Sequence, residues 1–213
     1  MTTRDPSSRI RIAFEVGLPQ ARWGPLFHVF RLEQPDVRVE WEPRDYPTRD
    51  SSLLCGADLG VFFEPPREAG LTGLTLEVSP MVVIVAAGDR LGDHAEVCVA
   101  DILDRAFPAG PSLDPDWMSF WTLDAQRGGP PAWSDEEVTS VAESLEVVAA
   151  GDAILTAPAS IAVGLAHPGV IALPLGDAPP VHTRLLWRPD QESPGVWSLI
   201  ELAAAWTRAS PNS

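Results

Sequence analysis

The chain has 213 residues, 45% of them hydrophobic, which is enough for one large domain or two small lobes with a sizeable core. Its 30 Asp and Glu outnumber the 15 basic residues, all of them Arg, and the formal charge is -15. A surface this acidic predicts that the chain alone does not hold nucleic acid or anionic membranes. The longest apolar run, Met81 to Ala87, is too short to cross a bilayer.

Residues 1–8 (MTTRDPSS) are polar and lack the apolar core of a signal peptide, so we expect a disordered leader and a cytoplasmic location. The first part of the chain then alternates apolar and polar residues in short runs. We expect a helix at 21–34, ended by Pro35, and a short helix at 51–55, closed by Gly56. The strands expected here are 9–14, 37–42, 58–63, 74–78 and 81–87.

In the second part, a helix is expected over 114–127, with Asp114 as its cap. Two capping boxes then compete, Ser134 with Glu137 and Ser140 with Glu143. We prefer the second because the surrounding pattern needs a strand before the helix, although 136–139 fits either state. The other elements expected are a helix at 99–103, a strand at 106–110, a strand at 154–157, a helix at 158–165, strands at 170–173 and 183–188, and a helix at 194–208.

Strands that alternate with helices predict an α/β protein with parallel or mixed sheets covered on both faces. Ser79-Pro80 and a second crossing near 174–177 interrupt this pattern. We therefore expect two lobes joined by two crossovers, lobe I from 9–79 and 175–209 and lobe II from 80–174. A cleft between two such lobes is where α/β proteins bind ligands.

The reactive side chains give no catalytic or metal signature. Cys55 and Cys98 stand in apolar contexts, and we expect buried, reduced thiols. No nucleophile elbow, phosphate-binding loop or dinucleotide fingerprint occurs, so neither a cofactor nor a metal is expected. The histidines are scattered singly along the chain: His28, His94, His167 and His182.

Several segments, in this order and spacing, resemble the effector-binding domain of LysR-type transcriptional regulators, with an actinobacterial-like subgroup as the nearest resemblance. They are RIRIAFEVG, FHVFRLEQPDVRVEW, LLCGADLGVFF, GLTLEVSPMVVIVAAGDRLGD, SLEVVAAGDAILTAPASIA, DPDWMSFWTL, PGVIALPLGDAPP and LLWR. The resemblance covers nearly everything from Arg9 to Arg208.

The resemblance implies a type 2 periplasmic-binding-protein fold that senses a small molecule and is not an enzyme. It also implies a homodimer through the first helix, where Trp23, Phe27 and Phe30 offer apolar surface. Family members carry an N-terminal helix-turn-helix, so DNA contact would come only through that missing module. Two alternatives stay open: an enzyme on this fold, with Glu15 or Glu64 as a base, and a stand-alone partner of a full-length regulator.

By the same resemblance, the loops that precede two helices face the cleft. Free N–H groups at helix N-termini suit a carboxylate or another small anion, and the hydroxyl of Ser112 can donate to it. Phe63 either stacks on the ligand or packs in the core, and the core is favoured, as it is for Trp117 and Trp121. The ligand-binding residues expected are Gly17, Leu18, Pro19, Gln20, Phe63, Glu64, Gly110, Pro111, Ser112 and Leu113.

Overall fold

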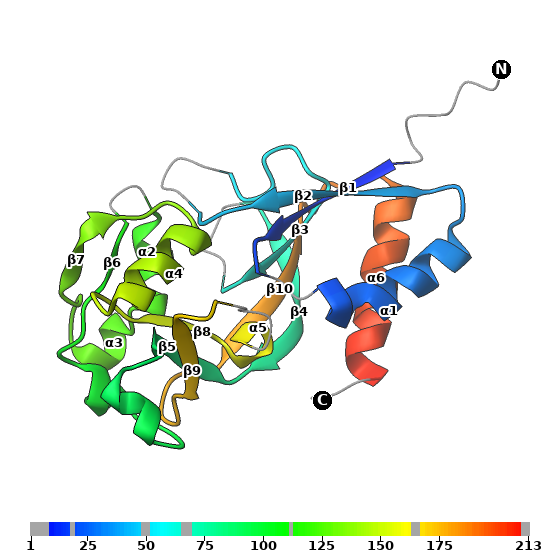
Figure 1. The fold of residues 1–213 in the computed structure, drawn as a ribbon. Helices are drawn as coiled ribbons and strands as arrows, with labels where there is room; N and C mark the ends of the chain where they lie inside the picture. Colours follow the sequence, from blue (N-terminus) through cyan, green and yellow to red (C-terminus); the bar gives the residue numbers. More distant parts are fainter. Residues whose placement is uncertain are drawn as a thin grey trace. The chain divides into compact units, whose positions relative to one another are not determined.

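The computed structural model describes residues 9–17, 20–47, 52–64, 70–110, 113–162 and 167–209, with only the backbone described at 20–22. The chain divides into two compact units (Figure 1). Unit 1 combines Met1–Arg44, Ser51–Val78 and His182–Ser213, and unit 2 combines Asp45–Asp50 with Ser79–Val181.

Unit 1 is built on a mixed five-stranded sheet with the order β2-β1-β3-β10-β4. β1 lies between β2 and β3 and runs parallel to both, and β10 returns antiparallel to the central strand β3. Each strand coincides with one of the runs read from the sequence, which confirms the mixed sheet. The strands are β1 (Arg9–Glu15), β2 (Arg38–Arg44), β3 (Leu59–Phe63), β4 (Thr72–Ser79) and β10 (Val181–Trp187).

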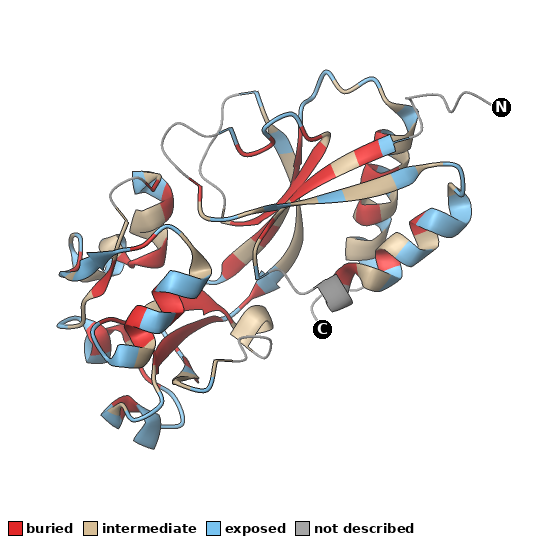
Figure 2. Ribbon diagram, turned by 45° about the horizontal axis from the view of Figure 1, so that its top comes forward, coloured by how far each residue is buried: buried red, intermediate tan, exposed pale blue. Residues whose placement is uncertain are grey.

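Two helices of unit 1, α1 (Gln20–Glu33) and α6 (Pro194–Ala209), contact each other beside this sheet (Figures 1 and 2). α6 buries Val196, Leu199, Ile200 and Ala203 at helical spacing. On α1, Trp23 is 7% exposed and Phe30 is fully buried. The expectation that these two side chains form a dimer surface is therefore wrong, because they belong to the core of their own unit.

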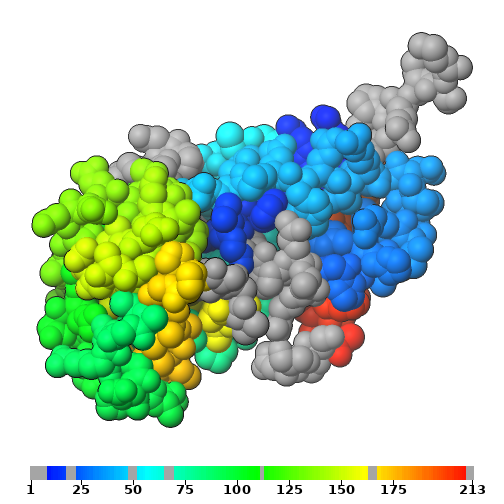
Figure 3. All heavy atoms as spheres, in the orientation of Figure 1, coloured from blue at the N-terminus to red at the C-terminus, as the bar shows by residue number. Residues whose placement is uncertain are grey.

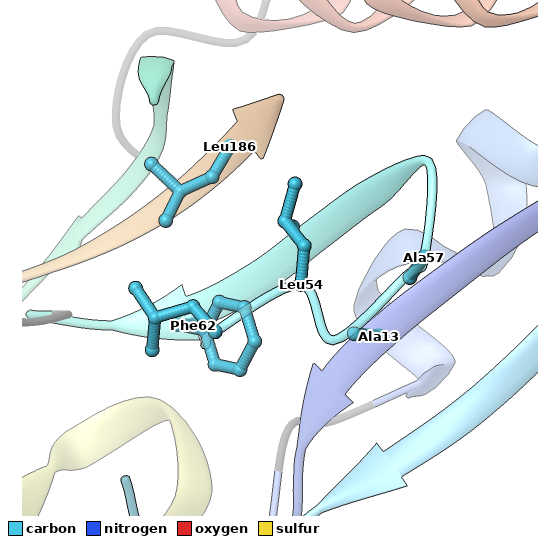
Figure 4. Close-up of a cluster of buried hydrophobic side chains, with 6 residues drawn as sticks. Ala13, Leu54, Ala57, Phe62 and Leu186 are labelled. Atoms are coloured by element: carbon cyan, nitrogen blue, oxygen red, sulfur yellow. The ribbon is translucent and has the colours of Figure 1, made fainter. Parts of the chain in front are cut away.

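The other face of the sheet packs on the segment before β3 (Figure 4). The expected helix at 51–55 is wrong, because residues 52–56 form bends and a turn, with Cys55 at φ 43° and Gly56 at φ 82°. This turn buries two leucines and leaves Cys55 exposed, which also corrects the expected burial of that thiol. The buried cluster consists of Ala13, Leu53, Leu54, Ala57, Phe62 and Leu186.

Unit 2 is built around β5 (Met81–Ala86), which lies between β8 (Leu155–Pro158) and β9 (Val170–Pro174) and is antiparallel to both. A separate parallel pair joins β6 (Phe107–Ala109) to β7 (Trp133–Glu137). The helical elements are 3-10 helices at Arg90–Asp93 and Val99–Ile102, α2 (Pro115–Trp121), α3 (Asp124–Arg127), α4 (Val141–Ala150) and α5 (Ala159–Ala162).

Capping explains where these helices begin and end. Asp114 accepts hydrogen bonds from the backbone N–H groups of Asp116 and Trp117, as expected. Ser140 caps α4 and Gly151 ends it at φ 89°, so the choice of the second capping box is confirmed. The single helix expected over 114–127 is wrong, because Leu123, fully buried, adopts a left-handed φ of 60° and separates α2 from α3.

The remaining features concern the two cysteines, possible metal ligands and possible membrane-spanning helices. Both cysteines are free, and Cys98, which is half-buried rather than buried, donates to the carboxylate of Asp101. Among the residues that the structure describes, no group of His, Cys, Asp or Glu is arranged to hold a metal ion. None of the helices described is long and apolar enough to cross a membrane.

Candidate functional site

In unit 1, two of the expected ligand-binding residues, Phe63 and Glu64, lie beside the carboxyl end of β1. β1 and β3 are parallel neighbours, with Phe14 opposite Val61, so their carboxyl ends lie together. Glu15 at the end of β1 accepts a hydrogen bond at Oε2 from the backbone N–H of Phe63, at 2.9 Å. The structure therefore places Glu15, at the end of β1, next to Phe63 and Glu64.

The loop between β1 and α1 is only partly described. Gly17 has a φ of 99°, a conformation that favours glycine, and it turns the chain after β1. α1 then begins at Gln20, so the first N–H groups of the helix follow the turn directly. Leu18 and Pro19, together with the side chain of Gln20, lie outside the described residues.

Glu15 is a buried acid at this edge, only 5% exposed. Burial raises the pKa of its carboxyl from 4.5 to about 8, although the hydrogen bond from the Phe63 N–H acts in the opposite direction. Glu15 is consequently neutral at pH 7, and the edge carries less negative charge than the sequence suggests.

A second pair at the same edge joins Glu64 to His182, the second residue of β10. The Glu64 N–H donates to the His182 carbonyl at 3.0 Å, and Glu64 Oε1 accepts from the His182 N–H and contacts its ring Nδ1. Both side chains are partly open to solvent, with His182 39% and Glu64 22% exposed.

Glu64 also has a left-handed φ of 35°, which is uncommon outside glycine. Its two hydrogen bonds to the backbone of His182 hold that conformation, and strained backbone of this kind is concentrated at functional sites. His182 was not among the residues expected at the site. In the sequence it lies 118 residues from Glu64, and only the antiparallel pairing of β10 with β3 brings the two together.

The aromatic residues considered as ligand contacts are largely core residues. Phe63 is 2% exposed, and Trp117 and Trp121 are 5% and 8% exposed, which confirms the favoured interpretation for all three. The Trp117 and Trp121 rings pack edge-on with centroids 5.9 Å apart. The side chain of Phe63 is therefore not free to stack on a ligand.

In unit 2, the loop after β6 is held by its own packing. Leu113 donates its N–H to the Gly110 carbonyl at 3.0 Å, and its side chain is 2% exposed. A Cβ at Gly110 would lie 2.5 Å from Leu113 Cδ1, so the close approach requires glycine. Leu113 thus anchors the loop instead of presenting its side chain to a ligand. Pro111 and Ser112 lie outside the described residues.

The start of α2 is also tied to the segment at 45–47. The Asp114 N–H donates to the Pro47 carbonyl at 2.9 Å, the Tyr46 ring lies 5.0 Å from that of Trp117, and its hydroxyl donates to Ser144 Oγ at 3.2 Å. A cavity of about 400 Å³ is lined by Gly110 and Leu113 and by the start of α2. Polar side chains that line it include Ser119, Asp124 and Glu137.

A match to a known family identifies the kind of protein to which this site belongs. The model of the LysR substrate binding domain matches residues 3–208. The chain belongs to the LysR substrate-binding domain family. It is therefore the effector-binding domain of a LysR-type transcription regulator, with the type 2 periplasmic-binding-protein fold, and it belongs to a family of regulators and not of enzymes.

Solved structures of this family share the fold at low sequence identity. Full-length BenM E226K aligns with a TM-score of 0.74 and 21% identity, covering 100% of this chain and 71% of that one. The BenM effector binding domain with its effector benzoate aligns at 0.69 and 22%, covering 94% and 92%. The effector binding domain of QuiR in complex with shikimate aligns at 0.76 and 17%, covering 94% and 97%. A search of curated proteins finds no match.

Proposed function

We propose that this effector-binding domain senses a small organic carboxylate at the edge formed by Glu15, Glu64, His182 and the start of α1. The observation that carries the proposal is the meeting of these groups at the carboxyl ends of two parallel strands. Ligands of α/β proteins bind at this end of the strands. Two of the relatives described above were solved with a small molecule, one with benzoate and one with shikimate, and both molecules are carboxylates.

The charge at the edge is compatible with an anion. Glu15 is neutral at pH 7, because its pKa is about 8. The Glu64 carboxylate accepts from the His182 backbone N–H and contacts the ring nitrogen. The N–H groups in the first turn of α1, which have no partner within the helix itself, then supply donors and a partial positive charge. The ring of His182, 39% exposed, is a further hydrogen-bonding group for the ligand.

We further propose that the loop at 110–113 contributes to the same effector, chiefly through backbone groups and Ser112. This proposal rests on the position of the loop between β6 and the N-terminus of α2, capped by Asp114. A ligand shifts a protein between two states only by the difference in its affinity for them.

A thermal-shift experiment on the whole chain tests this function. Benzoate and shikimate are titrated beside benzamide and shikimamide, which keep each ring but lack the negative charge. We expect at least one acid to raise Tm with saturation while its amide does not. Stabilisation by neither acid, or equal stabilisation by acid and amide, contradicts the carboxylate proposal.

The proposal also covers the oligomeric state of the domain, its cellular location and its route to DNA. We propose a homodimer in the cytoplasm, with DNA contact through a separate N-terminal module and membership of an actinobacterial-like subgroup. The exposed Leu32 (69%) and Trp41 (39%) supply apolar surface on α1 and β2 for such a dimer. Light scattering after size exclusion should give twice the chain mass, and Leu32→Glu should halve it. A strict monomer in the unsubstituted protein contradicts the dimer.

A further inference from the structure

The cavity beside α2 in unit 2, here the α2–β7 cavity, differs in chemistry from the effector edge. Its volume of about 400 Å³ lies within the range of roughly 300–1,000 Å³ that holds small molecules. Residues of α2, the first residue of α3 and both ends of β7 line it (Figure 1), and Glu15, Glu64 and His182 do not. The atoms of this part of the chain, in green, are visible at the surface of unit 2 (Figure 3).

The wall of the α2–β7 cavity carries two negative charges. Asp124 and Glu137 line it, and no Arg or His of the described residues does. The Thr122 hydroxyl donates to Asp124 Oδ1 at 2.6 Å, which holds that carboxylate in place. Glu137 lies at the end of β7, opposite Ala109, and is exposed. The charged groups of the wall therefore suit a cation and not an anion.

Arg127, three residues after Asp124, does not supply that cation. It attracts the Asp124 carboxylate, but it does not line the cavity. Its guanidinium instead donates to three backbone carbonyls of residues 102, 103 and 105. Asp135 and Glu136, both exposed on β7, make the potential around the cavity more negative still.

This charge separates the cavity from the proposed effector. Gly110 and Leu113, of the loop proposed to contribute to the effector, also line the cavity. A carboxylate placed beside Asp124 and Glu137 would meet two like charges, which is unfavourable. The cavity consequently takes a ligand of another class than the effector.

Aromatic and apolar side chains complete the wall. Trp133 lines the cavity and is 43% exposed, so its indole is accessible to a ligand. The face of an indole attracts cations more strongly than that of any other aromatic side chain. Met118 and Pro130 add apolar surface. The last turn of α2, which includes Met118, also carries the partial negative charge of a helix C-terminus.

We propose that the α2–β7 cavity binds a small organic ammonium ion with an apolar body. The ammonium group pairs with Asp124 and Glu137 and lies against the Trp133 ring, and the apolar body packs against Met118 and Pro130. Carboxylates form charge-assisted hydrogen bonds with an ammonium group, and the indole adds a cation–π contact. The site is independent of the effector edge and takes the opposite charge.

Isothermal titration calorimetry of the whole chain tests this site, at low ionic strength so that exposed charges are little screened. The ligands are phenethylammonium, 2-phenylethanol and phenylacetate, which share a phenyl ring and are positive, neutral and negative at neutral pH. We expect saturable binding of phenethylammonium, at least ~10-fold tighter than that of the other two. Equal or tighter binding of 2-phenylethanol or phenylacetate overturns the proposal.

Substitutions in the wall locate the binding. Glu137→Gln and Asp124→Asn should each weaken phenethylammonium by ~5-fold or more and leave 2-phenylethanol nearly unchanged, because each removes a charge and keeps the side-chain shape. Trp133→Leu should weaken it by ~3-fold. Glu136→Gln is the matched control, because it removes an exposed carboxylate of the same strand that does not line the cavity. It should change the affinity by less than ~2-fold.

A variant at the effector edge separates the two sites. Glu64→Gln should leave the affinity for phenethylammonium unchanged, and a loss there overturns the proposal because it assigns this ligand to the effector edge. Absence of saturable binding of phenethylammonium also overturns it. Equal losses in Glu136→Gln and Glu137→Gln do the same, since they would show general attraction to an acidic surface and not a site.

Discussion

At the scale of single residues, Glu15 is the clearest case of a side chain whose state the fold changes. Its pKa of about 8 in the folded protein lies above the ordinary 4.5. Between these values the folded protein keeps a proton that the unfolded chain releases. The contribution of Glu15 to stability is therefore unchanged below about pH 4.5, falls as pH rises through the window and levels off above about pH 8.

Glu15→Gln removes this titration and keeps an oxygen to accept from the Phe63 N–H. We expect the variant to gain stability relative to the original chain as pH rises from about 5 to about 8, by up to ~1 kcal/mol per pH unit. Urea unfolding at several pH values measures the difference. Glu201→Gln, an exposed site in the same unit, is the control and should show no such trend. Parallel curves for both variants would contradict the shifted pKa.

Gly60 in β3 is a second residue whose identity the packing requires. A Cβ there would lie 2.4 Å from Phe62 Cε2 and 2.7 Å from Leu54 Cδ2, inside the buried cluster of Figure 4. Gly60→Ala should therefore destabilise the protein by about 1–3 kcal/mol. Gly88→Ala is the matched control, because its Cβ would meet nothing within 4 Å and its φ is not left-handed. Equal denaturation midpoints for the two variants would show that the cluster tolerates the methyl group.

At the scale of elements, Arg127 links the end of α3 to the segment after a 3-10 helix. Its guanidinium donates to the carbonyls of Ile102 at 2.8 Å, Leu103 at 2.7 Å and Arg105 at 3.3 Å, and lies 5.5 Å from the centre of the Phe107 ring. One side chain thus supplies donors to the carbonyl of the last residue of the helix Val99–Ile102 and to two carbonyls that follow it.

Arg127→Lys keeps the charge but loses the planar fork of donors, so at least one carbonyl is left without its partner. We expect a loss of about 1–3 kcal/mol of unfolding free energy, measured by thermal or chemical denaturation. Arg208→Lys, at an exposed position in the last turn of α6, should change stability by less than ~0.5 kcal/mol. A similar small effect at both positions would mean that the three contacts contribute little.

Helices and turns could be predicted where the residues that define their ends lie within the segment itself, and could not where tertiary packing defines them. Local signals found α4 well, because Ser140, Glu143 and Gly151 mark both of its ends within the sequence. The break at Leu123 could not be read locally, since a buried leucine with a left-handed φ is set by its surroundings. The turn at 52–56 was wrongly predicted as a helix for a similar reason: its two leucines are buried against the sheet and do not form the apolar face of a helix.

The candidate site shows the same division. The ends of β1 and β3 follow from the strand pattern, and their meeting follows from parallel pairing. The pair of Glu64 with His182 depends on the antiparallel return of β10, which no local pattern specifies. Burial of Glu15, and hence its raised pKa, likewise depends on the packed fold.

At the scale of the whole molecule, the family of the chain agrees with the proposal that a small molecule binds at the sheet edge. The chain is a LysR effector-binding domain, and its output requires that a bound molecule change the balance between states. The charge of -15 makes direct attraction of DNA to this domain unfavourable, which agrees with a role in sensing and not in DNA contact.

The central claim is that the effector binds at the edge made by the ends of β1 and β3 and the start of β10. Hydrogen–deuterium exchange of the whole chain, with and without the acid that raises Tm, tests it most directly. The account predicts slower exchange in peptides that contain Glu15 to Gln20, Glu64 and His182, and in the peptide over 110–113. Unchanged exchange in all of these peptides, with protection confined to other segments, would contradict it.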